Sequence, residues 1–323
     1  MTPHLPMAGR GGGEFDQLRA IFERLGAAAG DLGDDCALVP LGDATLALSI
    51  DASLEGVHFR TEWLSFEEIG WRAAGAALSD LAAEGAEPVG VLVSLGLPAR
   101  KGGSGERGAV EPGAEIMAGV GACVASVGAK VLGGDLVRSE RYLVDVAVIG
   151  TVTRPVRRSG ARPGDGVWVT GVLGGAARAL AALRDGRSID QETRARFARA
   201  TPRIAAGTWL AARGATAMID ISDGLAADAA HLAAASGVAL EIDLERVPCW
   251  PEVDPLAAVA SGEEYELLVT LPAAFTQAEA QGLAQSGEVR LTRIGACVAG
   301  AGVRLSAHGR VVPAPAGWDH FAP

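Results

Sequence analysis

The chain has 323 residues and a formal net charge of −11 at pH 7, and 49% of its residues are hydrophobic, as in a globular protein. Because a single hydrophobic core rarely grows beyond about 250 to 300 residues, this length predicts two domains. The acidic balance argues against a nucleic-acid partner, since phosphate backbones are bound by clusters of Lys and Arg that this sequence lacks.

Composition also bears on the compartment. Residues 1–13 are rich in Gly and Pro, which predicts a disordered tail, and they lack the apolar core of a secretory signal. No run approaches the roughly 18 apolar residues of a membrane span. The four cysteines show no Cys-x-x-Cys spacing, which favours free thiols over a zinc site or a disulfide framework. We therefore expect a cytoplasmic protein without a membrane partner.

The first predicted element is an amphipathic helix at 14–25, where apolar residues recur at helical spacing. An acidic turn follows at Gly33, Asp34 and Asp35. Asp35 is a candidate metal ligand, whereas Asp34 is either a turn residue or a second ligand.

A strand is predicted at 45–50, followed directly by Asp51. Because side chains alternate along a strand, Ser49 and Asp51 should share one face, while Ile50 points to the core. His58 comes seven residues after Asp51. A lone histidine is more often structural than functional, so this pattern alone does not assign His58 a role.

Ser65 and Glu68 have the spacing of a capping box and predict a helix that runs to about residue 84. The apolar stripe of this helix ends at Asp80. An unpaired buried carboxylate costs several kcal/mol or changes its pKa. Asp80 therefore needs a cation, a hydrogen-bonding neighbour or an exposed helix end.

The next predicted elements are a strand at 88–97, a helix at 114–127 and a strand at 142–152. The loop at 101–113 is long enough for a mobile lid and equally fits a variable insertion. Gly133, Gly134 and Asp135 end an apolar run. Paired glycines let a backbone approach a ligand closely, but they also occur in ordinary turns.

A basic, Pro- and Gly-rich segment at 153–165 predicts the boundary between an N-terminal domain at 14–152 and a C-terminal domain at 153–323. Strands of the second domain are predicted at 167–170, 240–244, 266–271, 289–294 and 303–305. Strands and helices mix without strict alternation in both halves. This favours an α/β fold of the mixed α+β kind, with mixed sheets flanked by helices.

Two polar turns stand out in the second half. The Gly-rich turn at 171–175 lacks the Lys-Ser or Lys-Thr of a P-loop, so close helix packing is the better interpretation. Farther on, a strand ends at Asp220, with Ser222 and Asp223 just after it. Asp223 could be the N-cap of the helix that follows, but an N-cap does not explain Asp220.

Acidic residues at strand ends, at glycine turns or on an apolar helix face recur along the chain at Asp35, Asp51, Asp80, Asp135, Asp220 and Asp223. Oxygen ligands without Cys or His clusters suit Mg²⁺, which binds through a few carboxylates and substrate phosphates. An acidic protein with several such sites can hold ATP through metal ions.

These residues sit in motifs that resemble the thiamine-monophosphate kinase family, of the superfamily that also holds aminoimidazole ribonucleotide synthetase and selenophosphate synthetase. The motifs run in order over residues 14–321: GDDCAL, SIDASLEGVHF, LSDLAAEGAEP, VLGGD, RRSGARPGD, IDISDGL, SGEEYEL and GWDHF. The resemblance implies a two-domain aminoimidazole ribonucleotide synthetase-like fold, a homodimer formed through the N-terminal domain, and ATP-dependent phosphorylation of thiamine phosphate to thiamine diphosphate.

The resemblance also implies roles for individual residues. Several Mg²⁺ ions would be held by Asp35, Ser49, Asp51, Asp80, Asp135, Asp220 and Asp223. The nucleotide would meet Gly134, Asp135, Arg158 and Ser222, and thiamine phosphate would meet His58, Glu263 and Trp318. Asp51 and Arg158 would serve catalysis in a direct in-line transfer of the γ-phosphoryl group.

Three departures from the family pattern leave alternatives open. The chain has Ser49-Ile50-Asp51-Ala52 where the family commonly has Ser-Thr-Asp-Thr, GGDL for the usual GGDT, and SGEE for GGED. One rival is a related ATP-dependent enzyme with another acceptor. The other is a nucleotide-binding regulatory protein without catalysis, for which Ile50 and Ala52 are the best argument.

Overall fold

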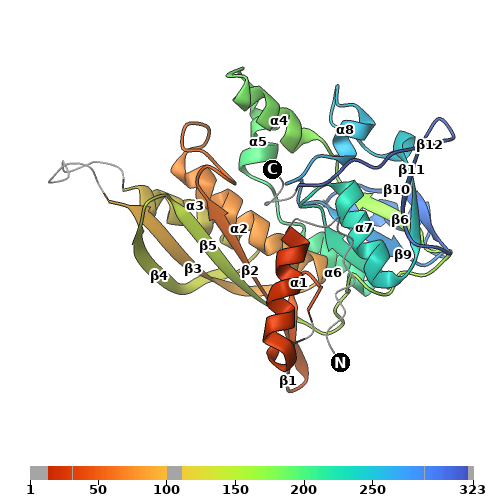
Figure 1. Ribbon diagram of the computed structural model, residues 1–323, viewed down its shortest axis with the longest axis horizontal. Helices are drawn as coiled ribbons and strands as arrows, with labels where there is room; N and C mark the ends of the chain where they lie inside the picture. The colour runs from red at the N-terminus through yellow and green to blue at the C-terminus, as the bar shows by residue number, and fades with distance from the viewer. Residues whose placement is uncertain (1–13, 31, 100–110, 287, 319–323) are drawn as a thin grey trace.

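The computed structural model describes residues 14–30, 32–99, 111–286 and 288–318. Within these ranges the chain forms two halves, each built on one mixed β-sheet with helices packed against it (Figure 1). The predicted tail at 1–13 and most of the predicted loop at 101–113 lie outside the described residues. None of the described helices is both long enough and apolar enough to cross a membrane.

The N-terminal half contains α1 (Glu14–Leu25), η1 (Gly26–Ala28), β1 (Ala37–Leu41), β2 (Ala44–Leu54), α2 (Phe66–Ala83), β3 (Glu87–Pro98), α3 (Pro112–Ser126), β4 (Lys130–Ser139) and β5 (Leu143–Val152). Its sheet has the order β1-β2-β5-β3-β4 in the described chain, with β3 and β4 parallel and the other neighbours antiparallel. Along β5 every second residue is buried. The buried side, which α2 and α3 cover, is the inner face of this sheet.

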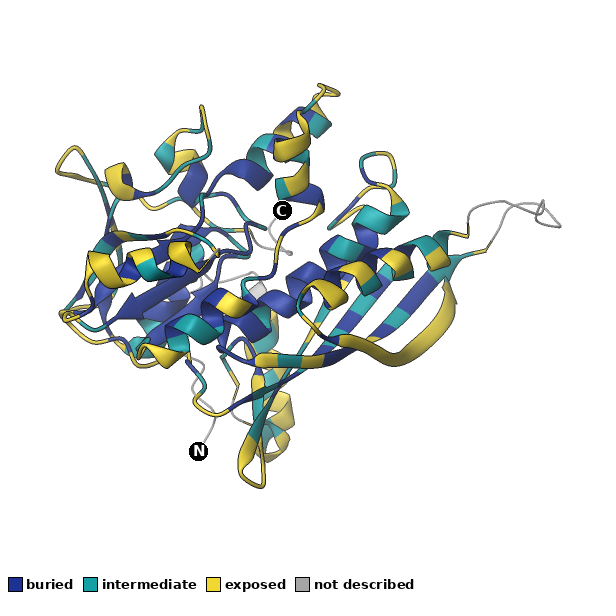
Figure 2. Ribbon diagram, turned by 180° about the vertical axis from the view of Figure 1, so that it is seen from behind, coloured by how far each residue is buried: buried dark blue, intermediate teal, exposed yellow. Residues whose placement is uncertain are grey.

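The opposite side, the outer face, carries large apolar side chains that remain exposed: Val39, Leu41, Ile50, Leu92 and Val137. Ile50 is 67% exposed, so the prediction that it points to the core is wrong. The predicted alternation is correct, because Ile50 lies opposite to Ser49 and Asp51. The covered face of the sheet is the one that carries these two polar residues. The edge strand β4 is exposed along almost its whole length (Figure 2).

Helix α2 joins the two halves. The capping box at its start is present in both directions, as predicted, because Ser65 accepts from the Glu68 N–H and Glu68 accepts from the Ser65 N–H. Most of α2 is buried (Figure 2), since it packs on β2 and β5 on one side and on β7, α5 and α6 on the other. The contact with α6 needs a glycine: a Cβ at Gly207 would lie 2.1 Å from the Ala82 carbonyl oxygen.

The C-terminal half contains β6 (Gly166–Thr170), α4 (Gly175–Arg184), α5 (Gln191–Ala198), α6 (Ile204–Ala212), β7 (Ala217–Asp220), α7 (Leu225–Ser236), β8 (Ala239–Asp243), η2 (Leu244–Arg246), α8 (Pro255–Val259), β9 (Leu267–Leu271), α9 (Gln277–Gln285), β10 (Leu291–Val298), β11 (Gly302–Ala307) and β12 (Arg310–Val312). Its sheet has the order β12-β11-β8-β10-β6-β9-β7 in the described chain, and β8 and β11 are parallel. Every residue of β6 and β9 is buried, as expected for central strands covered on both faces. The predicted mixed α/β fold is confirmed.

Two local predictions need correction. The strand predicted at 45–50 continues through Leu54, so Asp51 lies inside β2 and not after its end. The Gly133-Gly134-Asp135 segment is not a turn but part of β4. A Cβ at Gly134 would lie 1.8 Å from the Val93 carbonyl oxygen, so this glycine allows the close pairing of β4 with β3.

Candidate active site

Three segments far apart in the sequence bring together the carboxylates of Asp35, Asp80 and Asp220. Asp35 lies in the bend before β1, Asp80 in the last turn of α2, and Asp220 at the end of β7. One oxygen from each of the three lies within 4.8 Å of the others. We call these three residues the acidic cluster; it lies where the two halves of the molecule meet.

Repulsion within the acidic cluster is strong. Burial raises the pKa of Asp80 well above its usual value, and the charges of Asp220 and Asp35 raise it further. Burial and the charge of Asp35 raise the pKa of Asp220 to about 7. Asp80 also lies near the negative end of the α2 dipole, which disfavours a carboxylate there. The cluster therefore carries an excess of negative charge, and a cation would stabilise its ionised form.

The donor atoms of this cluster fit Mg²⁺. They are carboxylate oxygens, and the hydroxyl of Ser49 donates to Asp80 at 2.5 Å. Magnesium prefers such oxygen ligands, keeps several waters, and shares its remaining positions with substrate phosphates. Ser49 and Asp80, which the resemblance implies as metal ligands, thus lie in hydrogen-bond contact.

Arg158 is the cation nearest to Asp35. Its guanidinium forms a two-pronged contact with that carboxylate, with Nη2 at 2.7 Å from Oδ1 and Nε at 3.2 Å from Oδ2. Its backbone N–H donates to Asp34 Oδ1 at 2.9 Å. Asp34 therefore holds the segment between the two halves in place, which supports the interpretation of Asp34 as a turn residue.

Asp51 lies on the inner face of β2, two residues after Ser49. Its charge adds to the raised pKa of Asp80, after burial and the charges of Asp220 and Asp35. Asp51 thus borders the acidic cluster on the side of the N-terminal sheet.

Ser222 and Asp223 border the acidic cluster on the side of the C-terminal sheet. Asp223 is not an N-cap, because Gly224 holds that position and makes no side-chain cap bond. Instead, the backbone N–H of Asp223 donates to Asp228 Oδ2 at 3.2 Å. The charge of Asp223 also raises the pKa of Asp220, after burial and Asp35. The side chain of Asp223 is therefore not committed to capping α7.

Trp318 reaches the same place from the far end of the chain. Its backbone N–H donates to the Asp223 carbonyl at 3.3 Å, and its side chain is 56% exposed. Gly317 packs against Ala227 in the first turn of α7. An aromatic ring is therefore presented beside the loop that carries Asp220 and Asp223.

His58 lies in the turn after β2 and is half buried. Its Nδ1 accepts a hydrogen bond from the Leu54 N–H at 3.0 Å. A ring nitrogen that accepts carries no proton, so this contact assigns the neutral form with the proton on Nε2. The bond also fixes the orientation of the ring.

Glu263 forms an ion pair with Arg72, a residue that the sequence analysis did not single out. Arg72 comes from α2 and is almost fully buried, with its guanidinium 4.1 Å from the centre of the Phe197 ring. Burial is the largest single effect and lowers the pKa of Arg72, but the charges of Glu263, Tyr265 and Asp51 and the hydrogen bond to Glu263 together raise it. A buried arginine on an Ala-rich helix, eight residues before Asp80, was the available signal.

Gly134 and Asp135 are not brought to the acidic cluster within one chain. The strand register puts Gly134 in the cross-strand row of Asp51, so Asp135 belongs to the neighbouring row on the outer face. There Asp135 lines a cavity of about 310 Å³ together with Ile50, Ser94 and Asp145.

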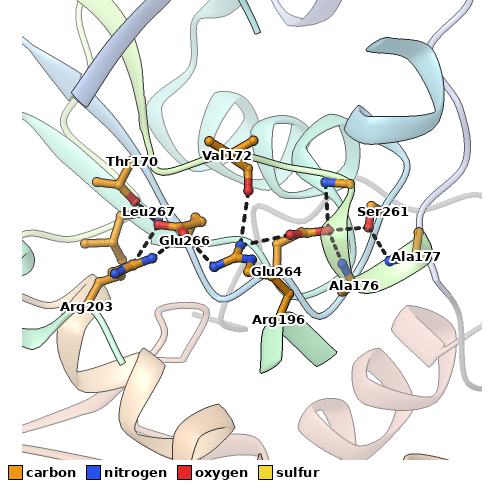
Figure 3. Close-up of polar contacts among 11 residues, drawn as sticks. Thr170, Val172, Ala176, Ala177, Arg196, Arg203, Ser261, Glu264, Glu266 and Leu267 are labelled. Carbon is orange, nitrogen blue, oxygen red and sulfur yellow. Dashed lines mark hydrogen bonds and ion pairs between the residues drawn. The ribbon is translucent and has the colours of Figure 1, made fainter. Parts of the chain in front are cut away.

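The Gly-rich turn at 171–175 is a packing element, as predicted. The N–H groups of Gly174 and Ala176, at the start of α4, already donate to Glu264 Oε1 at 2.8 and 3.2 Å (Figure 3). Since these donors are occupied by a carboxylate of the same chain, they are not available to a phosphate.

Comparisons with known proteins agree with this geometry. Residues 33–152 match the family model of the AIR synthase related protein N-terminal domain, and residues 162–308 match that of its C-terminal domain. The chain is 38% identical to the thiamine-monophosphate kinase of Halobacterium salinarum over 94% of its own length and 99% of that relative. It is 33% identical to the thiamine-monophosphate kinase of Aquifex aeolicus over 96% of its length and 98% of that relative.

Among solved structures, the chain resembles AaThiL complexed with AMPPCP and TMP. The TM-score is 0.82 at 32% sequence identity, and the match covers 96% of this chain and 97% of that one.

Proposed function

Because this chain belongs to the thiamine-monophosphate kinase family, we propose that it transfers the γ-phosphoryl group of ATP to thiamine phosphate and so forms thiamine diphosphate. The observation that carries this proposal is the acidic cluster, whose repelling carboxylates meet Arg158 between the two halves. AMPPCP is an ATP analogue, and its complex with TMP in a relative supports the same pair of substrates.

We assign the metal-binding role to Asp35, Ser49, Asp51, Asp80, Asp220 and Asp223. Bound Mg²⁺ would neutralise the charge of the phosphates as they approach and would share their oxygens. Arg158 adds a fixed positive charge beside Asp35, and Asp51 faces the reacting groups from β2. The acceptor is itself a phosphate with a second pKa of about 6, so it is already deprotonated and needs no general base. Positioning and charge neutralisation then supply the catalysis.

The acceptor would lie against His58, Glu263 and Trp318. The exposed indole of Trp318 suits a flat, cationic thiazolium ring, since cations bind aromatic faces. With Nδ1 accepting from Leu54, Nε2–H is the donor through which His58 would meet a phosphate oxygen. Ser222, Gly134, Asp135 and Arg158 would meet the nucleotide.

The position of Asp135 supports a further part of the proposal, a homodimer formed through the outer face of the N-terminal sheet. This face exposes Val39, Leu41, Ile50, Leu92 and Val137, and water contact with such a surface is unfavourable. A second copy would cover it and would lie against the cavity that holds Asp135.

We also propose the division into domains at residues 152 and 153, where β5 has just ended. The cytoplasm is the proposed compartment, because Cys36, Cys123, Cys249 and Cys297 are free thiols.

Incubation with Mg-ATP and thiamine phosphate tests the function, with thiamine diphosphate and ADP measured by chromatography. Equal amounts of the two products support the proposal. ATP binding without product would instead support a non-catalytic nucleotide-binding protein. ADP formed only with a different acceptor would support another activity of the superfamily.

A further inference from the structure

The segment from Glu263 to Glu266 presents alternate side chains to opposite sides. Glu263 contacts Arg72 beside the candidate active site, and Tyr265 is buried near Asp51 and Asp220, whose charges contribute to its raised pKa after burial and Glu263. Glu264 and Glu266 are instead fully buried and contact Arg196 and Arg203 of the C-terminal half (Figure 3).

The backbone of this segment is strained. Glu263 has φ of 58° and Tyr265 has φ of 51°, which is the left-handed region that residues with a side chain rarely adopt. Such a conformation costs on the order of 1 to 3 kcal/mol per residue and persists only where the surroundings enforce it. Two strained residues in three positions therefore need an explanation from their neighbours.

Those neighbours form what we call the buried Arg–Glu network, made of Arg196, Arg203, Glu264 and Glu266. Both glutamate side chains have no exposed surface. Arg203 contacts both oxygens of Glu266, at 2.6 and 2.8 Å, and Arg196 bridges the two carboxylates at 3.1 Å to each. The network has two positive and two negative charges and is neutral.

Hydroxyl and backbone donors complete the network. Ser261 donates to Glu264 at 2.5 Å, and Thr170 donates to Glu266 at 2.7 Å while accepting the Leu267 N–H at 2.8 Å. The two carboxylates flank the strained residues directly, and every one of their oxygens accepts at least one hydrogen bond (Figure 3). No carboxylate oxygen is left for a ligand, so the network is not a binding site.

A buried ion-pair network contributes little net stability compared with apolar packing, because the charges lose their hydration. What it provides here is orientation. The strained backbone lies against the loop of the candidate active site, with the Glu263 N–H donating to Ser222 at 2.6 Å and the Tyr265 N–H to Ile221 at 2.9 Å. With this backbone fixed, the Glu263 carboxylate is directed toward Arg72.

We infer that Arg196, Arg203, Glu264 and Glu266 are positioning residues that hold Glu263 in its strained conformation and so direct its carboxylate toward the acceptor. The inference rests on the proposed function, in which Glu263 meets thiamine phosphate. It concerns the acceptor side of the site, so the effect on ATP binding, which is transmitted from Glu263 through the Ser222 carbonyl, should be smaller.

The mildest test is Thr170→Val, which removes the hydroxyl beside Glu266 and keeps the shape of the side chain. We expect kcat/KM for thiamine phosphate to fall about tenfold, as a misplaced contact group would cause, with a smaller change in KM for ATP. Thr170→Ser, which retains the hydroxyl, should restore most of the activity. Thr270→Val is the matched control, because Thr270 is equally buried in the same sheet and bonds Thr216 and Ala217. Its kcat/KM should stay at the wild-type value.

A double-mutant cycle with Glu263→Gln separates positioning from general damage. If the network acts through Glu263, Thr170→Val should have no further effect on kcat/KM in the Glu263→Gln background. An equal loss in both backgrounds would overturn the inference, as would an equal loss for Thr270→Val.

A crystal structure of the Thr170→Val protein gives a readout that does not depend on activity. We expect Glu263 to leave Arg72 and its φ to become negative. An unchanged segment would overturn the positioning role even if thiamine diphosphate is formed. Conversely, a wild-type protein that forms no thiamine diphosphate would reject the proposed function, while the displacement of Glu263 would still test the network.

Discussion

The acidic cluster and the buried Arg–Glu network both bury carboxylates between or beside the two sheets, yet their charge balance is opposite. In the network each glutamate is matched by an arginine. The arginines keep the pKa of Glu266 low against the effect of burial, whereas burial raises the pKa of Glu264 despite Arg196. In the acidic cluster burial and mutual repulsion raise the pKa of Asp80 and Asp220. Every carboxylate oxygen of the network is hydrogen-bonded within the chain, although Arg196 Nε has no hydrogen-bond partner among the described residues. In the cluster three carboxylates share one arginine, Arg158, so negative charge is in excess.

Buried carboxylates that are paired within the chain and buried carboxylates in excess have different consequences for ligand binding. A saturated network fixes geometry and offers nothing to a ligand. An unsaturated cluster destabilises the protein alone and thereby favours binding of a cation, because the cation relieves the repulsion. Substitutions in the two places should therefore have opposite effects on stability.

Among substitutions within the acidic cluster and the network, the largest expected effect is on catalysis, from Asp220→Asn in the acidic cluster. Loss of this ligand should lower kcat by about 10³-fold, a value typical for loss of a group that stabilises transition-state charge. The free energy of unfolding without metal should rise, since one repelling charge is gone. Steady-state kinetics and urea unfolding in EDTA measure the two effects. A variant with wild-type kcat, or one that is less stable in EDTA, would contradict the assignment.

In the buried Arg–Glu network, Glu266→Gln should destabilise the protein. The substitution leaves Arg203 buried without its negative partner and removes one of the two carboxylates that Arg196 contacts. Breaking a buried ion pair in this way costs about 3 to 5 kcal/mol. Urea unfolding of the variant and the wild type gives this difference. A change below 1 kcal/mol would show that the network is not held by its charge balance.

Glu84 is a buried acid that belongs neither to the acidic cluster nor to the buried Arg–Glu network. It has no exposed surface, and burial followed by the charges of Asp34 and Asp35 raises its pKa to about 9 from 4.5. The folded state therefore holds this proton more tightly than the unfolded state. The resulting stability is fully present below about pH 4.5 and is lost as the pH rises toward 9, by at most about 1.4 kcal/mol per unit.

Glu84→Gln cannot ionise, so its stability relative to the wild type should increase with pH across this window. Unfolding curves at pH 5, 7 and 8.5 test the slope. A difference that does not vary with pH would mean that Glu84 is not a buried, protonated acid.

The smallest effect is expected for the exposed pair of Glu241 and Arg304, whose side chains are each about half exposed. Glu241→Gln should change the free energy of unfolding by less than about 1 kcal/mol, since exposed ion pairs contribute little. The same urea experiment measures it. If Glu241→Gln lowers the free energy of unfolding as much as Glu266→Gln does, then burial is not the reason that the two ion pairs differ in their contribution to stability.

The sequence predicted much of the local structure because its signals are local. The capping box at Ser65 and Glu68 fixed the start of α2, and alternation along β2 correctly placed Ser49 and Asp51 on one face. The orientation of Ile50 was predicted wrongly, because alternation cannot tell which face of a sheet is covered. The paired glycines Gly133 and Gly134 were likewise compatible with a turn, and the sequence did not show that β4 continues through them.

Individual acids could be identified from the sequence, but not which of them meet. Asp35, Asp80 and Asp220 converge because α2 packs on both sheets, a long-range event without a local signal. Arg72 was missed for the same reason, since its ion pair with Glu263 joins the two halves. The left-handed backbone of Glu263 was missed because it depends on contacts within the C-terminal half that are distant in sequence.

The central claim is that the acidic cluster supports direct phosphoryl transfer from ATP to thiamine phosphate, and Asp51 provides its most direct test. Wild-type and Asp51→Asn proteins are incubated with Mg²⁺, γ-³²P-ATP and thiamine phosphate, after circular dichroism has established that both are folded. The account predicts labelled thiamine diphosphate from the wild type and none from the variant. Labelled product from a well-folded Asp51→Asn protein at the wild-type rate would contradict it.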